Sequence, residues 1–186
     1  MAAFLPERKS AQVCSQFKAS RLKRKLMPKH PKLENIERFK LETEIQLRFG
    51  DIDLMRHVNN ARYLTFFEQA RIDYMIRVLG WSGQAGEMNI ILANTNCDWI
   101  QPLFLADRCI LKSRVTQIGN KSFTMEYIVG KRGTIFEDAS SADYQACAYA
   151  TAVLVGYDMA SSSSVALPES FKEKVLAFEP QAPDVK

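Results

Sequence analysis

The chain has 186 residues, of which 47% are hydrophobic and 25% charged, proportions typical of an ordinary globular protein with one domain. No apolar run reaches the roughly 18–20 residues of a membrane-spanning helix, and no signal-peptide-like stretch stands at the N-terminus. The four cysteines are scattered, with no CxxC pair and no nearby histidines, which argues against a zinc site or a dense disulfide framework. We predict reduced thiols, no metal and a cytoplasmic location.

The net charge of +4 is unevenly distributed. Residues 1–32 contain nine Lys or Arg and a single acid, Glu7, whereas residues 33–186 contain 16 basic and 20 acidic residues, a net charge of −4. Nucleic-acid binding needs a basic face on the domain, so we predict no nucleic-acid partner. Residues 1–36 are predicted to form a basic, flexible extension. A transit peptide for a mitochondrion or plastid is the alternative, and a tail that contacts RNA or anionic lipid is a weaker one.

The first predicted element is a half-buried strand over residues 39–49. Its apolar residues alternate almost strictly with charged and amide side chains, as a strand with one buried face requires. They are Phe39, Leu41, Ile45, Leu47 and Phe49.

A helix is predicted next, from about Asn60 to Leu79. Gly50 and two aspartates interrupt the strand before it, Asn59 or Asn60 can cap it, and Gly80 can end it. Its apolar residues form a stripe at helical spacing, which predicts that the helix is covered on more than one side. The stripe consists of Tyr63, Phe67, Ala70, Tyr74 and Val78, widened by Leu64, Met75 and Leu79.

Strand patterns dominate the rest of the chain. We predict strands over 88–99, 109–118, the region around 123–129, and 143–157, with a two-residue hairpin turn at Gly119-Asn120. In the last strand one face is predicted to carry Cys147 and Tyr149, and the other a row of four alanines at 146, 148, 150 and 152. Small side chains allow a bulky element to approach closely, so the alanine row is predicted to face the helix.

This order predicts an α+β fold in which one long helix is wrapped by an antiparallel sheet of about five strands. We place the domain at residues 37–158. Residues 159–186 are predicted to form a linker, a short helix over Pro168–Phe178 and a disordered tail.

The segment from Arg48 to Arg71 contains the residues best suited to chemistry. It sets Asp51, Asp53, His57 and the amides of Asn59 and Asn60 around a strand-to-helix turn. The unpaired N–H groups of a helix first turn favour negative charge and can stabilise an oxyanion on a polarised carbonyl. A neighbouring carboxylate can attack that carbonyl or activate a water.

This segment, together with Asn96–Pro102 and Asp107, resembles the 4-hydroxybenzoyl-CoA thioesterase-like branch of the hotdog superfamily. The resemblance covers about residues 38–157 and implies a single hotdog domain that hydrolyses acyl thioesters. It also implies Asp53 as the catalytic carboxylate and Asn60 as the residue whose backbone N–H polarises the thioester carbonyl. His57 matches a catalytic histidine of the similar plant acyl-ACP thioesterases, but Met55 stands where those enzymes carry an Asn. Arg56 stands where many bacterial relatives carry Gly.

Each of these residues also has a plainer interpretation. Asp53 or Asn59 can be a helix cap, Asp51 can order the turn, and His57 can bond to backbone. Tyr63 and Phe67 can be core residues, although the first helix of this family can line an acyl pocket. We predict Asp53, His57 and Asn60 as catalytic and Asn59, Tyr63 and Phe67 as substrate-binding. Glu68 and Arg71 can form a structural ion pair.

The predicted substrates are acyl-CoA esters, with acyl-ACP esters as the alternative. Coenzyme A or the carrier protein enters only as part of the substrate, so no cofactor is predicted. The resemblance further implies a homodimer or homotetramer whose sheets join edge to edge. Two rivals stay open: a hydratase of the same fold, although its Asn-Pro is missing between Asp53 and His57, and a catalytically silent acyl-binding protein.

Overall fold

The computed structural model describes residues 33, 35–84, 86, 89–136, 143–179 and 183–185, so residues 1–32 and 34 of the predicted extension over 1–36 lie outside the described residues. After a short 3-10 turn, η3 (Ile36–Arg38), five strands form one antiparallel sheet. In spatial order they are β1 (Leu41–Ile45), β3 (Asp107–Ile118), β4 (Ser122–Thr134), β5 (Tyr144–Asp158) and β2 (Ile90–Trp99). The two edges of the sheet are therefore β1 and β2.

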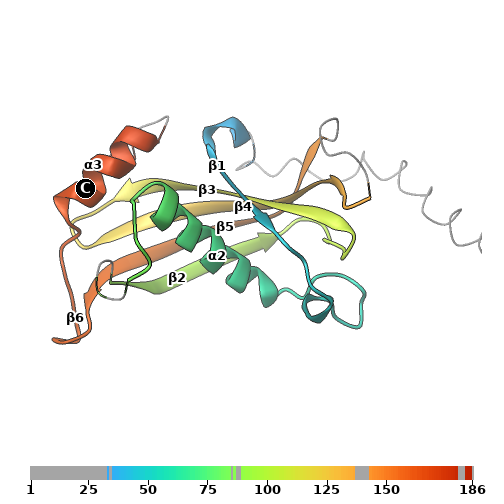
Figure 1. Ribbon diagram of the computed structural model, residues 1–186, viewed down its shortest axis with the longest axis horizontal. Coiled ribbons are helices and arrows are strands. Elements are labelled where there is room, and N and C mark those ends of the chain that lie inside the picture. The colour runs from blue at the N-terminus through green and yellow to red at the C-terminus, as the bar shows by residue number, and fades with distance from the viewer. Residues whose placement is uncertain are drawn as a thin grey trace, which may run out of the picture. The chain divides into compact units, whose positions relative to one another are not determined.

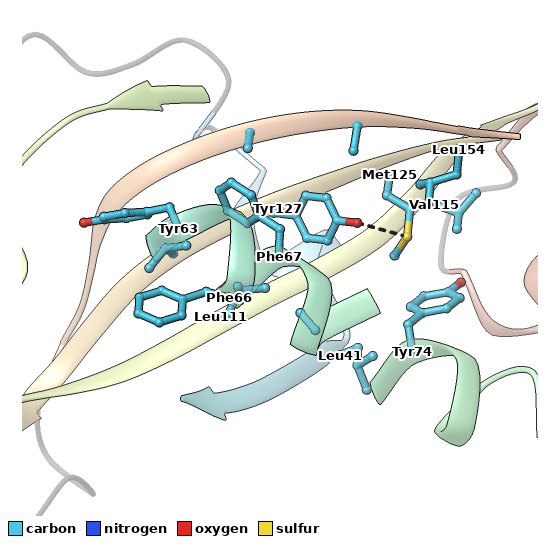
Figure 2. Packing of buried hydrophobic residues seen from close by; sticks show 14 of the residues in the cluster. Leu41, Tyr63, Phe66, Phe67, Tyr74, Leu111, Val115, Met125, Tyr127 and Leu154 are labelled. Carbon is cyan, nitrogen blue, oxygen red and sulfur yellow. Dashed lines mark hydrogen bonds between the residues drawn. The ribbon is translucent and has the colours of Figure 1, made fainter. Parts of the chain in front are cut away.

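Helix α2 (Arg62–Arg77) crosses one face of this sheet (Figure 1). Its buried side chains meet the sheet in one continuous core, in which the rings of Phe67 and Tyr127 stack with centroids 5.1 Å apart (Figure 2). The Tyr127 hydroxyl donates to the Met125 sulfur at 3.3 Å. The buried helix residues are Tyr63, Phe66, Phe67, Ala70, Tyr74 and Met75. One long helix against five antiparallel strands confirms the predicted α+β class.

Two predictions about the first strand and the helix are wrong in detail. β1 ends at Ile45, and Phe49 is 86% exposed, because the chain turns into the 3-10 segment η4 (Phe49–Asp51), where the Arg48 N–H donates to the Asp51 carboxylate at 2.8 Å. Leu64 is 52% exposed and does not widen the buried stripe. At the far end of α2, Gly80 adopts a φ of 72°, which glycine accepts readily, and it ends the helix as predicted.

The alternation predicted for β5 is interrupted by a bulge. Val129 pairs with Ala148 but the next residue of β4, Gly130, pairs with Ala146, so Cys147 is the extra residue. Its carbonyl accepts from the backbone N–H groups of Ile100 (2.8 Å) and Gln101 (3.1 Å). Cys147 therefore lies in the helix-facing core, whereas Ala146 packs against a smaller cluster of Phe39, Ile128 and Tyr149 on the other face. The faces predicted for Cys147 and Ala146 are wrong, whereas the face predicted for Tyr149 is confirmed. The remaining alanines, Ala148, Ala150 and Ala152, share the main core with the α2 aromatics.

The β3–β4 turn also differs from the prediction. The Gly119 N–H donates to the Ser122 carbonyl at 2.7 Å, so the two-residue turn is Asn120-Lys121, one residue later than expected. The Asn120 carbonyl accepts from Leu167 N–H at 2.8 Å, which ties this turn to the segment before α3.

The C-terminal segment packs into the same unit. After the short β6 (Ser163–Ser164), helix α3 (Glu169–Phe178) contributes Phe171 and Val175 to the main core. Beyond α3, β7 (Asp184–Val185) pairs in parallel with Gln117–Ile118 of β3, so the prediction of a disordered tail is wrong for these residues. Within the described residues, no helix is both long enough and apolar enough to cross a membrane.

Glu179, which follows α3, has a buried carboxylate. One of its oxygens accepts from the Tyr74 hydroxyl at 2.6 Å and from the Val115 N–H at 2.9 Å. Burial raises the pKa of this carboxyl, and the two hydrogen bonds oppose that rise only in part. Glu179 thereby links α2, β3 and the end of α3 through one buried group.

Candidate active site

The loop between β1 and α2 is held in shape by backbone hydrogen bonds. Ile52 and Val58 form an isolated antiparallel bridge, and the Asp53 N–H donates to the His57 carbonyl at 3.0 Å. The Val58 N–H donates to the Leu103 carbonyl at 2.8 Å, which fixes the loop to the segment after β2. The candidate catalytic residues therefore lie on an ordered turn.

Asp51 stabilises this turn, as its plainer interpretation states. Its carboxylate accepts from the Arg48 N–H and lies 3.6 Å from the Arg62 guanidinium, and its carbonyl accepts from the Asn59 N–H at 2.8 Å. Arg62 also donates to the Gly50 carbonyl at 3.0 Å. Sequence reasoning did not single out Arg62, because nothing in its spacing signals that it reaches back across the loop.

Asp53 lies at the centre of the turn with 26% of its side chain exposed. Its Oδ1 accepts from the Met55 N–H at 2.8 Å, which leaves Oδ2 for other partners. The His57 Nδ1 is 3.9 Å from Oδ2, too far for a hydrogen bond, and lies 3.2 Å from the Val58 carbonyl. Nδ1 therefore faces backbone, and Asp53 and His57 are neighbours that do not hydrogen-bond.

Asn59 and Asn60, which precede α2, have different roles. Asn59 Oδ1 accepts from the Ala61 N–H at 2.9 Å and so stabilises the turn that leads into α2, a structural role close to the helix cap of its plainer interpretation. The N–H groups of Arg62, Tyr63 and Leu64 donate to the carbonyls of the residues three before them. The Asn60 N–H has no acceptor in the described part of the chain. That leaves Asn60 with a backbone donor available at the positive end of the helix.

The two predicted substrate-binding aromatics are buried in this chain. Tyr63 and Phe67 are each 2% exposed, and Tyr63 packs edge-on against Trp99 with ring centroids 6.4 Å apart. Burial raises the pKa of the Tyr63 hydroxyl well above its ordinary value. Both residues lie in the first two turns of α2.

The suggested Glu68–Arg71 ion pair is absent from the described residues. Arg71 instead lies at the Tyr127 hydroxyl, whose pKa burial raises to about 12 although the guanidinium opposes that rise.

The cysteines offer no alternative nucleophile in the described part of the chain. Burial raises the pKa of Cys97 to about 11 and that of Cys147 to about 12, and it raises the pKa of Cys109 as well. These thiols stay protonated at neutral pH and unreactive. The described residues contain no group of three or more His, Cys, Asp or Glu side chains placed to hold a metal ion.

A cavity of about 380 Å³ lies away from this turn, beside the residues that follow α2 and the start of α3. Because α2 has 16 residues and spans about 24 Å, this cavity is separate from the turn that carries Asp53. The residues that line it include Leu79, Trp81, Ile90, Leu167, Phe171 and Lys174.

Comparison with known protein families identifies the family to which this fold and this turn belong. The model of the thioesterase-like superfamily matches residues 47–175, which include the turn that carries Asp53, α2 and four of the five antiparallel strands, β2 to β5. The chain belongs to the thioesterase-like superfamily. Membership of this superfamily confirms the hotdog fold, whereas the 4-hydroxybenzoyl-CoA branch stays a prediction.

Three similar proteins align with this chain along nearly their whole length. The long-chain acyl-CoA thioesterase FadM of Escherichia coli (strain K12) is 26% identical over 136 residues, covering 73% of this chain and 96% of that protein. A solved structure from Pseudomonas aeruginosa strain PAO1 superposes with a TM-score of 0.67 at 29% identity, covering 78% and 96% of the two chains. A Thermus thermophilus thioesterase complexed with coenzyme A and zinc gives 0.64 at 28% identity, covering 78% and 98%.

Proposed function

We propose that this protein hydrolyses acyl-CoA thioesters to a free acid and coenzyme A. The observation that carries the proposal is that two groups suited to acyl transfer lie on one ordered turn. The Asp53 carboxylate has one oxygen unused, and the Asn60 backbone N–H has no acceptor in the described part of the chain. An attacking group and an oxyanion donor are the two components that acyl transfer requires.

In the proposed reaction, the thioester carbonyl oxygen accepts a hydrogen bond from the Asn60 N–H. As the carbonyl carbon becomes tetrahedral, the oxygen gains negative charge, which the N–H and the helix dipole stabilise. Asp53 acts in one of two ways. As a nucleophile it forms a mixed anhydride and expels the thiolate, after which water hydrolyses the anhydride. As a general base it takes a proton from the attacking water.

His57 is proposed to act beside Asp53 through its second ring nitrogen, Nε2. Because Nδ1 lies within hydrogen-bonding distance of the Val58 carbonyl, a proton on Nδ1 leaves Nε2 as a lone-pair acceptor. The imidazole is 32% exposed, so Nε2 can exchange protons with water and with the departing thiolate.

Coenzyme A is proposed as the carrier, in preference to acyl carrier protein. An acidic carrier protein favours a basic partner, and residues 33–186 have a net charge of −4. The named activity of the Escherichia coli relative and the coenzyme A complex of the Thermus thermophilus relative point the same way.

The working unit is proposed to be at least a homodimer. β2 is an edge strand of the sheet, and edge strands left open are sites of association. Three apolar side chains along β2, Ile91, Leu92 and Trp99, have 41–49% of their surface exposed. A second copy that pairs with this edge would cover them.

Light scattering should give a mass of at least twice the 21.2 kDa of one chain. Leu92→Glu places a charge in the proposed interface, and we expect it to weaken association at least about tenfold because the carboxylate loses its water on burial. Met159→Glu is the matched control, since Met159 is 70% exposed on the turn after β5, and it should leave the mass unchanged. A monomeric wild type would overturn the dimer, and equal effects of both variants would overturn its placement.

The proposed activity is tested by thiol release from short, medium, long and aromatic acyl-CoA esters. We expect turnover, with free thiol and free acid formed in equal amounts, on at least one class of ester. Activity only on acyl-ACP esters would replace the carrier. Saturable binding of acyl groups without any turnover would favour the silent binding protein, and hydration of enoyl-CoA without thiol release would favour the hydratase.

A further inference from the structure

Arg56 has a backbone conformation that arginine rarely adopts. Its φ is 64°, and among the described non-glycine residues only Ser162 shares a positive φ. The left-handed region is strained for a residue with a Cβ, and glycine would occupy it without strain. The sequence therefore places a strained arginine three residues after Asp53.

The turn holds Arg56 in this conformation by bonds to Asp53. The Arg56 N–H donates to the Asp53 carbonyl at 2.9 Å, and the preceding residue, Met55, donates to the Asp53 carboxylate. A residue at such a position faces solvent, and Arg56 is exposed. Backbone strain of this kind is concentrated at functional sites of proteins.

The Arg56 guanidinium has no hydrogen-bond or ion-pair partner among the residues that the structure describes. Arg62, on the same loop, is by contrast tied to Asp51 and Gly50. Arg56 is thus a permanent, available cation beside a carboxylate that would repel an anionic substrate.

We propose that Arg56 binds a phosphate of the coenzyme A part of the substrate. This inference rests on the proposed function and names one of its substrate contacts. A guanidinium donates two parallel N–H bonds to phosphate oxygens, a geometry that no other side chain offers. The contact also offsets the repulsion between Asp53 and a substrate that carries several negative charges. Both the diphosphate and the 3′-phosphate are sources of this chemistry.

The test compares three thioesters of one acyl group: the CoA ester, the dephospho-CoA ester and the N-acetylcysteamine ester, which has no phosphate. Arg56→Gly removes the guanidinium and also relieves the backbone strain, so we expect the variant to fold. We expect the ratio of kcat/KM for the CoA ester to that for the N-acetylcysteamine ester to fall about tenfold. The fall should lie in KM and should shrink at high salt.

Arg48→Gln is the matched control, since Arg48 is an exposed arginine on the same loop, and it should change the ratio less than twofold. A tenfold fall that disappears with the dephospho-CoA ester assigns the contact to the 3′-phosphate, and one that persists assigns it to the diphosphate. An unchanged ratio in Arg56→Gly, or an equal fall in Arg48→Gln, overturns the proposal.

Failure of the proposed thioesterase activity can be told apart from failure of the Arg56 contact, because the wild type would then hydrolyse none of the three esters. In that event calorimetric titration of coenzyme A into wild type and Arg56→Gly still decides the contact. An affinity at least about tenfold weaker in the variant supports it, and equal affinities overturn it.

Discussion

Asp53→Asn is expected to lower kcat for acyl-CoA hydrolysis by about a thousandfold, with the fold intact. The amide keeps the size of the carboxylate and can still accept the Met55 N–H, so the turn keeps its shape. What it loses is the ability to attack a carbonyl or to take a proton from water, an effect worth about 10²–10⁴ in rate. Thiol release gives kcat and KM, and thermal melting followed by circular dichroism checks the fold.

Asp51→Asn is the matched control for this variant, two residues away on the same loop. Because the Asp51 carboxylate accepts from the Arg48 N–H and lies beside Arg62, its loss should lower the melting temperature. Its effect on kcat should stay below about tenfold, since Asp51 does no chemistry in the proposed reaction. Activity of Asp53→Asn within tenfold of wild type, or a larger kcat effect in Asp51→Asn, would show that the chemistry lies elsewhere.

Gly130→Ala is expected to lower the free energy of unfolding by about 3 kcal/mol, the upper part of the range for overpacking a core. Gly130 lies opposite the β5 bulge, and a Cβ there would clash with the Tyr144 ring and lie 2.7 Å from the Gln145 carbonyl. The ring cannot easily withdraw, because the Tyr144 hydroxyl is within hydrogen-bonding distance of the carbonyls of Ile110 (3.1 Å) and Ile128 (2.9 Å). Urea unfolding measures the loss.

Gly50→Ala provides the comparison, because a Cβ at Gly50 meets nothing within 4 Å and Gly50 has no positive φ. It should be neutral or stabilising by a few tenths of a kcal/mol, since alanine restricts the unfolded chain. In the double variant Gly130→Ala with Tyr144→Ala, the combined loss should be smaller than the sum of the two single losses, because the clash with the ring is gone. Equal stability of the two glycine variants would contradict the packing described at Gly130.

The class of fold could be predicted from the sequence because α2 and the long strands show their own periodicity. The apolar stripe from Tyr63 to Tyr74 and the alternation in β4 are local patterns, and both are confirmed. The bulge at Cys147 could not be predicted, because it depends on N–H groups of Ile100 and Gln101, which lie more than 40 residues away in the chain. A local pattern holds no information about such a partner.

In the candidate site, too, local features could be predicted from the sequence and features that depend on the folded turn could not. The motif predicted that Asp53, His57 and the two asparagines share one turn, and the structure places them there. It could not divide the asparagines into one that stabilises the turn through its side chain and one with an open N–H, because that depends on which carbonyls the next three amides reach. Nor could it predict the positive φ of Arg56, which the hydrogen bonds of the folded turn impose on an unfavourable residue.

The buried link through Glu179 has a consequence for synthesis of the chain. The Tyr74 hydroxyl and its acceptor are separated by 105 residues. At the roughly 5–20 residues per second of protein synthesis, about 5–20 s pass between the addition of Tyr74 and that of Glu179. Once β3 has been made, its Val115 N–H lacks an acceptor until Glu179 is added, and its last residues lack their parallel partner until β7 follows. The end of β3 beyond its pairing with β1 is therefore open to chaperones or to another chain until nearly the whole sequence has been made.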